Sequence, residues 1–276
     1  MDRAVISDDD FTAFQCFLEA ASGIRLAAGK EYLVLSRLGG LMRQKGIATI
    51  SELLGHLESG RLPGLQSEVI DAMTTNETFW FRDLFHYQLL INKILPEHKA
   101  GGGQGLSIWS AACSSGQEPY NISMMVQEYH AIHATGGGPN TQIIASDISP
   151  KILAEAKRGI YCGIAAARGL TVDQQRRYFV PKGDCLEVRA EIRGRVRFET
   201  MNLLQDFQRL GKFDIIFCRN VLIYFSSERK RSIISRLAAS LKPNGYLFLG
   251  STESLSAYSD RFAMVKGFGG IAYRML

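Results

Sequence analysis

The chain has 276 residues, of which 46% are hydrophobic and 21% charged, and these values predict an ordinary globular protein with one large domain or a small and a medium one. No apolar run approaches the ~20 residues that a membrane helix needs, and the acidic start of the chain lacks the apolar core of a secretory signal. These features argue against membrane insertion and predict a cytoplasmic protein. The net charge of +5 is modest for a protein that binds nucleic acid.

Cysteine and histidine usage indicates neither a disulfide framework nor a metal site. The five cysteines are odd in number and lie far apart, and none stands in a CxxC pair, which argues against a disulfide scaffold or a structural zinc site. His130 and His133 are three residues apart and could share one helix face, but no cysteine or carboxylate cluster accompanies them. We therefore interpret them as the solvated end of a helix and expect no bound metal.

Residues 8–73 are expected to form a small module made only of helices. Acidic residues open the first helical pattern and Gly23 follows its end, which is the usual polarity of a helix. The third pattern has Thr49 or Ser51 as its N-terminal cap, and the fourth has Pro63 near its start.

The second helical pattern, residues 29–46, carries basic side chains beside an apolar stripe. The stripe consists of Val34, Leu38, Leu41 and Met42. Arg37 and Arg43 flank it on opposite sides. The surrounding segment 25–45 holds five basic residues against one acid, and segment 158–197 is also rich in arginine, which suggests contact with something acidic. Solvated basic surface is an equally good interpretation of both segments.

From about residue 105, short β-rich runs alternate with longer helical runs. This alternation predicts an α/β fold with a doubly wound, mostly parallel sheet. We expect the last strand, "GIAYRM", to return beside "GYLFLG" as a hairpin. The glycine runs Gly101–Gly103 and Gly136–Gly138 suit turns or linkers. Residues 162–197 interrupt the alternation, and their β-type pattern around Gly194 predicts a small hairpin.

The stretch "SIWSAACSSGQEPY", residues 107–120, has the strand, loop and helix start of a nucleotide-binding unit. Ligands of open α/β sheets lie outside the carboxyl ends of the strands, so the loop of small residues is the expected place for one. A dinucleotide fingerprint would hold three glycines, whereas this loop has only Gly116. Glu118 and Pro119 begin the helix, and an acidic side chain there disfavours a phosphate and favours a cationic ligand.

The second strand ends at Asp147, and an acid at this position often binds ribose hydroxyls. The alternative is that Asp147 only caps the next helix. Two acids, with no lysine suited to a phosphate, fit a ligand that has a ribose, an adenine ring and a positive centre. S-adenosylmethionine has these groups, because its sulfonium is cationic and it carries no phosphate. The expected hairpin at the end of the sheet also favours a methyltransferase over a dehydrogenase.

Residues 73–83, "MTTNETFWFRD", join the helical module to the α/β part. Thr74 and Glu77 fit a capping box, which is the simplest interpretation. The alternative is a ligand-binding segment with polar side chains on one side, namely Asn76, Thr78 and Arg82. The aromatic residues 79–81 would then shield a pocket from water. Because a sulfonium would repel Arg82, this arginine is expected to hold a carboxylate of the cofactor or of an acceptor.

The stretch "FDIIFCRNVLIYF", residues 213–225, is apolar until Arg219 and Asn220. These two side chains are therefore expected at the carboxyl edge of the sheet, over the ligand site. Tyr224 follows within a turn, and the alternative for it is a place in the core.

Together these stretches resemble the CheR family of chemotaxis receptor methyltransferases, over nearly the whole chain. The resemblance implies methyl transfer from S-adenosylmethionine to glutamate side chains on the cytoplasmic helices of chemoreceptors, with S-adenosylhomocysteine as product. It implies cofactor contacts from nine residues, which are Asn76, Thr78, Arg82, Glu118, Asp147, Asn202, Leu203, Arg219 and Asn220. It places Arg82 and Tyr224 nearest the transferred methyl group. The family's loop usually reads Glu-Glu-Pro, whereas this chain has Gln117 in place of the first acid.

The resemblance also implies roles for the parts of the chain. They are a helical receptor-recognition domain at 1–75, a linker with a cofactor-contacting helix at 76–104, and a methyltransferase domain at 105–276 with a small antiparallel β-subdomain at about 162–197. Arg37 and Arg43 would read the acidic substrate helices electrostatically. Some members bind a receptor tail peptide by strand addition to the β-subdomain, but the short turn after "RYFVPKGD" favours a protein without this tether. A monomer is expected.

Two other functions fit part of the sequence. An RNA or DNA methyltransferase would use the basic segments to contact phosphates. Its strand end would carry the Asn-Pro-Pro-aromatic signature of amino-group methylators, whereas this one reads Arg-Asn-Val-Leu. A non-enzymatic sensor of S-adenosyl compounds would not need Arg82 and Tyr224. We therefore expect chemoreceptors as partners, with no nucleic acid and no membrane insertion.

Overall fold

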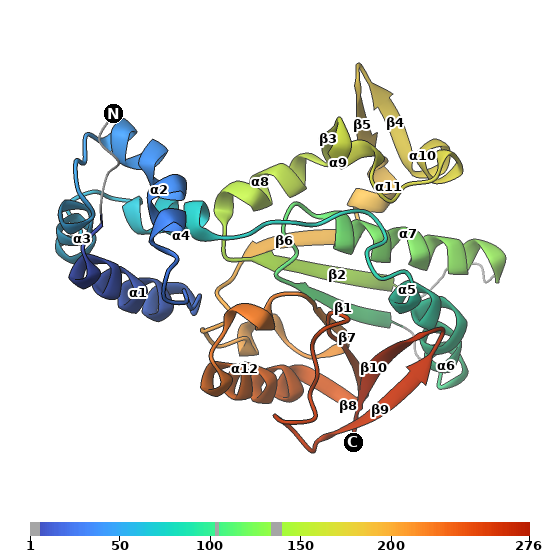
Figure 1. Ribbon diagram of the computed structural model, residues 1–276. Coiled ribbons are helices and arrows are strands. Elements are labelled where there is room, and N and C mark those ends of the chain that lie inside the picture. The colour runs from blue at the N-terminus through green and yellow to red at the C-terminus, as the bar shows by residue number, and fades with distance from the viewer. Residues whose placement is uncertain (1–5, 103–104, 134–139) are drawn as a thin grey trace.

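The computed structural model describes residues 6–102, 105–133 and 140–276. A group of helices at the N-terminus, in blue, stands beside a larger twisted sheet with helices on both faces, and a smaller sheet projects from that larger part (Figure 1). The glycine run Gly136–Gly138 lies outside the described residues, whereas Gly101 and Gly102 form a turn as predicted.

Four helices make the N-terminal part, and they are α1 (Asp8–Ser22), α2 (Glu31–Lys45), α3 (Ile50–Ser59) and α4 (Leu65–Met73). This confirms the predicted helical module. The hydroxyls of Ser7 and Thr49 cap α1 and α3 by accepting backbone N–H bonds, so Thr49 rather than Ser51 begins the third helix. The apolar stripe of α2, which includes Val34 and Leu38, packs into one core shared by the four helices.

The larger sheet contains β1 (Gly105–Ala111), β2 (Asn140–Asp147), β6 (Val196–Thr200), β7 (Phe213–Cys218), β8 (Leu241–Phe248), β9 (Phe262–Gly267) and β10 (Gly270–Met275). Their spatial order is β6-β2-β1-β7-β8-β10-β9. The first five strands in this order run parallel, β10 is antiparallel to β8, and β9 is antiparallel to β10. The predicted doubly wound sheet with an antiparallel last strand is confirmed.

The far end of this sheet differs in one respect from the expectation. The last strand, β10, pairs with β8 as expected, but its hairpin partner is β9, which the sequence did not indicate. β9 forms the edge of the sheet, and its side chains are exposed or half-buried. It therefore lacks the continuous apolar run by which buried parallel strands are recognised.

The helices around this sheet are α5 (Phe85–Leu89), α6 (Leu95–Ala100), α7 (Gln117–Ile132), α8 (Pro150–Arg158), α11 (Ala190–Arg193) and α12 (Ser227–Ser240), with a π-helical turn at Leu90–Ile94 and 3-10 helices at Gln208–Leu210 and Leu222–Tyr224. α7 and α12 cover opposite faces (Figure 1). Alternate residues of the central strands therefore enter separate cores. Ile108 and Ile215 pack on the α7 side, and Trp109 and Ile216 on the α12 side. Burial on both faces explains why these strands read as nearly continuous apolar runs.

The smaller sheet contains β3 (Ile160–Cys162), β4 (Phe179–Lys182) and β5 (Cys185–Val188), with α9 (Ile164–Ala167) and α10 (Val172–Tyr178) between β3 and β4. All its pairings are antiparallel, as predicted, but the expected hairpin around Gly194 is wrong. Gly194 ends α11, and the following strand, β6, belongs to the larger sheet. The small sheet with its helices therefore spans residues 160–188 rather than 162–197. The alternating sequence pattern around Gly194 was interpreted wrongly as a hairpin because it covers strands of two different sheets. β5 of the smaller sheet and β6 of the larger sheet lie on either side of the short helix α11.

A disulfide joins Cys162 of β3 to Cys185 of β5. The two cysteines are 23 residues apart in the sequence but directly opposite in the antiparallel register, with Cα atoms 4.3 Å apart. The argument from cysteine spacing against disulfides is therefore wrong for this pair, since only the strand register brings them together. Cys16, Cys113 and Cys218 are free.

Candidate active site

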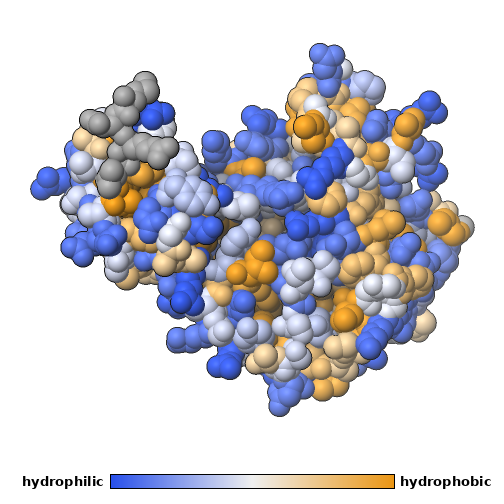
Figure 2. All heavy atoms as spheres, in the orientation of Figure 1, coloured by the Kyte–Doolittle hydropathy of each residue, from blue (hydrophilic) through white to orange (hydrophobic). Residues whose placement is uncertain are grey.

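A cavity of about 350 Å³ lies at the carboxyl ends of the parallel strands, between the N-terminal helices and the larger sheet. Figure 2 shows the notch that separates these two parts at the surface. The cavity is lined by all the residues that the resemblance assigned to the cofactor or to methyl transfer, which are Asn76, Thr78, Arg82, Glu118, Asp147, Asn202, Leu203, Arg219, Asn220 and Tyr224. Of the two arginines assigned to the substrate, Arg37 lines the cavity, whereas Arg43 is exposed on α2 and does not.

The loop between β1 and α7 turns sharply through left-handed backbone at Ala112, Ser114 and Gly116. A Cβ at Gly116 would lie 2.9 Å from the Cβ of Ala156 and 3.1 Å from the hydroxyl of Tyr161. The single glycine is therefore required by close packing against α8 and β3, in addition to its backbone angle. Gln117 is buried and accepts a hydrogen bond from Ser115, and it does not line the cavity. The missing acid of the loop therefore lies away from the ligand space.

Asp147, at the end of β2, is almost fully buried at the cavity wall. Its carboxylate accepts N–H bonds from Ser114 at 2.9 Å and from Ser149 at 3.1 Å, and it thereby fixes the β1–α7 loop. Burial raises the pKa of Asp147 above its usual value, although these bonds oppose the shift. The cap of α8 is Ser149, which accepts the N–H of Ile152, so the interpretation of Asp147 as the helix cap is wrong. Each carboxylate oxygen retains acceptor capacity, which suits the hydroxyls of a ribose.

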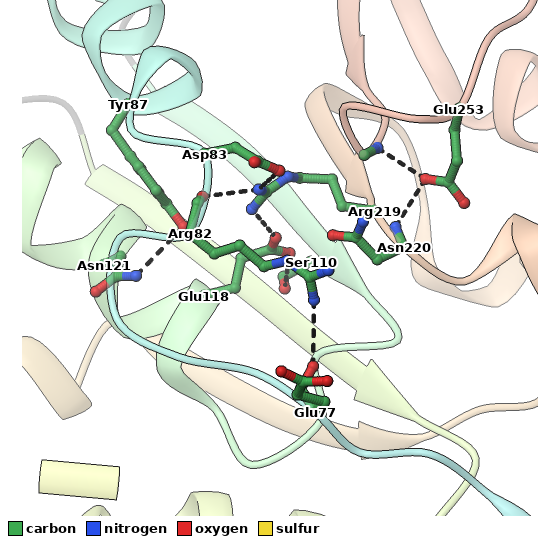
Figure 3. A network of polar contacts seen from close by, with 11 residues as sticks. Glu77, Arg82, Asp83, Tyr87, Ser110, Glu118, Asn121, Arg219, Asn220 and Glu253 are labelled. Carbon is green, nitrogen blue, oxygen red and sulfur yellow. Dashed lines mark hydrogen bonds and ion pairs between the residues drawn. The ribbon is translucent and has the colours of Figure 1, made fainter. Parts of the chain in front are cut away.

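A buried arginine, Arg219, joins the end of β7 to the linker and to α7 (Figure 3). Its guanidinium donates to Glu118, to Asp83 and to the backbone carbonyl of Arg82, each at 2.7 Å. Burial opposes its charge, but Glu118 and Asp83 outweigh burial and hold the pKa of Arg219 above its usual value. Glu118 also accepts the hydroxyl of Ser110 at 2.8 Å. Two carboxylates against one guanidinium leave this group of three residues with a formal charge of −1, so it favours a cation beside it even though Glu118 is paired.

The linker after α4 forms no capping box, which corrects the simplest interpretation of its sequence. Thr74 follows the last residue of α4, its hydroxyl donates to the carbonyl of Asp71 at 2.8 Å, and the next five residues are not helical. The carbonyl of Asn76 accepts the hydroxyl of Ser114, which holds the linker against the β1–α7 loop. The three aromatic residues of the linker have different surroundings. Phe79 lines the cavity, whereas Trp80 and Phe81 are buried in the core.

The N-terminal helices close one side of the cavity. The amide of Asn202 donates to the carbonyl of Ala21 at 2.8 Å, and the N–H of Arg25 donates to the carbonyl of Tyr224 at 3.0 Å. A Cβ at Gly23 would lie 2.3 Å from the ring of Phe225, so the end of α1 packs directly against the loop after β7. The one nitrogen of the Asn202 side chain, Nδ2, thus donates to the N-terminal domain, while Asn202 and its neighbour Leu203 both line the cavity.

Sequence reasoning missed Asp83 and Glu253. Asp83 directly follows Arg82 at the end of the stretch 73–83, so the role expected for Arg82 could have drawn attention to Asp83. Glu253 lies three residues after Gly250, which follows the end of β8, and a polar residue near the carboxyl end of a parallel strand was a signal for it. The contribution of segment 22–33 to the wall had no local signal, because it depends on how the two domains pack.

Within residues 6–102, 105–133 and 140–276, no group of three or more His, Cys, Asp or Glu side chains is placed to hold a metal ion. No helix in this part of the chain is both long and apolar enough to cross a membrane. His133 stacks on Tyr129 at the end of α7, with ring centroids 4.2 Å apart.

The fold and the site define an S-adenosylmethionine-dependent methyltransferase. The sheet ends in an antiparallel pair, and its carboxyl edge offers the small-residue loop and the acceptors of Asp147 to an adenosine. The net negative group of Asp83, Arg219 and Glu118 suits the cationic amino and sulfonium groups of this cofactor. The residues present therefore fit S-adenosylmethionine.

Comparison with known proteins narrows the class to a family. Residues 76–270 match "CheR methyltransferase, SAM binding domain", and residues 9–74 match "CheR methyltransferase, all-alpha domain". The chain is 48% identical to Chemotaxis protein methyltransferase Cher2 of Pseudomonas putida and 49% identical to Chemotaxis protein methyltransferase 1 of Pseudomonas aeruginosa, in both cases over 96% of this chain and 97% of the relative. It is 43% identical to the Chemotaxis protein methyltransferase of Vibrio parahaemolyticus over the full length of both. The chain belongs to the CheR methyltransferase family and is an S-adenosylmethionine-dependent methyltransferase of chemotaxis.

A solved structure, magnesium protoporphyrin IX methyltransferase (ChlM) from Synechocystis PCC 6803 with bound SAM, matches over 99% of this chain and 97% of its own. Its TM-score of 0.38 and 16% identity are too low for any argument about this protein.

Proposed function

We propose that this methyltransferase acts on glutamate side chains in the cytoplasmic helices of chemoreceptors and releases S-adenosylhomocysteine as product. The observation that carries the proposal is the common cavity of Arg82, Tyr224 and the cofactor residues, with the basic Arg37 of the N-terminal domain on the same wall. The basic side chains of Arg37 and Arg82 at this cavity favour an anionic acceptor. The three curated relatives above are named chemotaxis protein methyltransferases, which supports a receptor as the acceptor.

The proposed chemistry needs no general base. A glutamate side chain is already an anion at neutral pH, because its reference pKa is ~4.3. The bound cofactor supplies an electrophilic methyl group on a positively charged sulfur. A carboxylate oxygen of the acceptor would form the new bond to the methyl carbon while the carbon–sulfur bond breaks and the neutral sulfide leaves, so the step would move no proton. The buried His86, next to this site, is held neutral, since burial and Arg219 lower its pKa to about 2.

The chain's own residues then contribute orientation and exclusion of water. Arg82 is proposed to hold the acceptor carboxylate by charge-assisted hydrogen bonds, and Tyr224 to donate its hydroxyl from the opposite loop. Asp147, Glu118, Arg219 and Asn220 would fix the cofactor. Holding the two reactants in line in a cavity closed by the N-terminal helices would be the main source of rate.

The test is methyl transfer to purified chemoreceptor cytoplasmic fragments with methyl-labelled S-adenosylmethionine. We expect label on the fragment that mild base releases as methanol, which identifies a methyl ester. A fragment whose methylation-region glutamates are replaced by alanine is the control and should stay unlabelled. Label that resists base, or transfer to RNA or DNA in parallel reactions, would contradict the proposed acceptor.

The two α2 arginines are expected to respond differently to charge reversal. Arg43→Glu should raise the KM for the receptor fragment by about tenfold and leave the Kd of S-adenosylhomocysteine unchanged, because Arg43 is exposed and away from the cavity. Arg37→Glu should impair both quantities, because its guanidinium donates to the carbonyls of Met73 and Thr74 and so holds the linker. Steady-state kinetics at two salt concentrations and calorimetry measure these values.

Arg61→Glu is the matched control for these variants, since Arg61 is an exposed arginine of the same domain outside segment 25–45. It should change neither quantity. An unchanged KM in Arg43→Glu would remove Arg43 from the proposed receptor surface.

The proposal includes a monomeric enzyme in the cytoplasm that needs no receptor tail peptide. Only Gly183 and Asp184 join β4 to β5, and this two-residue turn supports the absence of a tether.

A further inference from the structure

One carboxylate, Glu253, joins the loop after β7 to the loop after β8. Its Oε2 accepts the N–H groups of Asn220 and Gly250, both at 2.7 Å, and its Oε1 accepts the N–H of Ile223 at 3.3 Å (Figure 3 draws the bonds to Oε2). Its own N–H donates to the carbonyl of Gly250 at 2.9 Å, which closes the turn that carries it. One half-buried side chain therefore accepts three backbone donors at the edge of the cavity.

The loop after β7 needs such support because its backbone is strained. Asn220 has a φ of 56°, in the left-handed region that residues other than glycine adopt only at a cost in free energy. Glu253, in the loop after β8, accepts the N–H of this same residue. A charged acceptor makes stronger hydrogen bonds than a neutral one, so the carboxylate offsets the strain.

Close packing fixes the side chain of Asn220 at the same point. A Cβ at Gly250 would lie 2.5 Å from the Nδ2 of Asn220 and 2.8 Å from the Oε2 of Glu253. The Asn220 amide and the Glu253 carboxylate thus share the space that a side chain at position 250 would occupy. The direction in which Asn220 reaches the cavity depends on all three residues together.

We propose that Glu253 is a positioning residue for methyl transfer, which holds Asn220 and Tyr224 in their places at the cavity wall. Glu253 does not line the cavity as the described residues define it, so it acts through the loop. Asn220 and Tyr224 both belong to the loop between β7 and α12, and Glu253 accepts the backbone N–H groups of Asn220 and Ile223 within it. The inference rests on the proposed roles of Asn220 and Tyr224, and it adds a residue to which no cofactor or acceptor contact is assigned.

The test begins with Glu253→Gln, which keeps the shape of the side chain but replaces one acceptor oxygen by an NH2 donor that faces backbone N–H groups. At a temperature well below the unfolding midpoint, kcat should fall about 100-fold, as a displacement of about 1 Å in a catalytic loop produces. The Kd of S-adenosylhomocysteine, measured by calorimetry, should rise about tenfold because Asn220 is displaced. The Kd measurement does not depend on which acceptor is methylated, so it separates this inference from the receptor proposal.

A second step asks whether Glu253 acts through the backbone of Asn220. Glycine adopts the left-handed conformation without strain. In an Asn220→Gly background, Glu253→Gln should therefore cost clearly less in kcat than it does in the wild type, so the two changes are coupled. Equal costs in both backgrounds would overturn the proposal.

Glu228→Gln is the matched control, because Glu228 is an exposed carboxylate in the first turn of α12, just after the same loop. It should leave kcat and Kd unchanged. A purely structural Glu253 would lower the unfolding temperature of Glu253→Gln and leave both constants of the folded protein unchanged, which would overturn the inference. If Glu253→Gln does not fold, Glu253→Asp serves in both comparisons, since it keeps the charge but shortens the reach to the three donors.

Discussion

Replacing Arg219 with methionine is expected to lower the free energy of unfolding by about 3–5 kcal/mol, the range for breaking a buried ion pair by removing one partner. Methionine fills a similar volume, but it leaves the carboxylates of Glu118 and Asp83 without their cation in a site where their side chains are only 12% and 20% exposed. The binding of S-adenosylhomocysteine should weaken by about 2–3 kcal/mol, because the anchoring bonds to both carboxylates are lost. Urea unfolding and calorimetry measure the two effects.

Two comparisons isolate the charge of Arg219. Arg209→Met removes an arginine that is 60% exposed and paired with Glu199, so it should cost less than about 1 kcal/mol. The double variant Arg219→Met with Glu118→Gln should lose less stability than the two single variants added together, because it removes the uncompensated charge. Strict additivity, or an unchanged Kd in Arg219→Met, would show that the buried network does not organise the site.

The residues of this network show what the sequence could predict. Asp147 is the last residue of β2, and Arg219 and Asn220 directly follow β7. Because the carboxyl ends of parallel strands meet at one edge, their gathering in one cavity follows from the strand order. Glu118 was found in the same way, as the start of the helix after the first strand. These positions depend on local patterns and one topological rule.

What the sequence could not provide depends on packing between distant segments. The negative charge of Glu118 favoured a cationic ligand in the sequence, but its partner Arg219 lies 101 residues away, and only Asp83 restores the net negative charge. Gly116 was interpreted through the ligand, whereas its immediate neighbours are Ala156 and Tyr161. A pattern of residue types carries no information about which side chain fills the space above a glycine.

The wrong prediction of a capping box has a similar cause. Thr74 and Glu77 satisfy the spacing of a capping box, yet Thr74 follows the end of a helix, and the extended linker is held by Ser114 and Arg37 instead. Local hydrogen-bonding rules fit both ends of a helix when the chain is viewed without its partners. The tertiary contacts that decide between them are those that bring the linker to the cavity.

Arg82→Ala is expected to lower kcat about 100-fold with receptor fragment as acceptor, because charge-assisted hydrogen bonds of about 1.5–3 kcal/mol and the in-line orientation of the carboxylate are lost together. The guanidinium of Arg82 lines the cavity, where it donates to the carbonyl of Glu77 at 3.3 Å and lies 5.8 Å from the centre of the Phe79 ring. Arg82→Lys should recover only part of the rate, since an ammonium lacks the planar fork. The Kd of S-adenosylhomocysteine should rise by a smaller factor than kcat falls.

The chain contains a matched control for this arginine. Arg168 lies over the same Phe79 ring, at 4.1 Å, and pairs with the carboxylate of Glu77 at 3.3 Å, but it does not line the cavity. Arg168→Ala should therefore leave kcat within about twofold of the wild type, the size of effect usual for an exposed pair. Tyr224→Phe should lower kcat about tenfold through the loss of one hydroxyl bond. If Arg82→Ala and Arg168→Ala behave alike, the stacking on Phe79 explains the effect and Arg82 does not orient the acceptor.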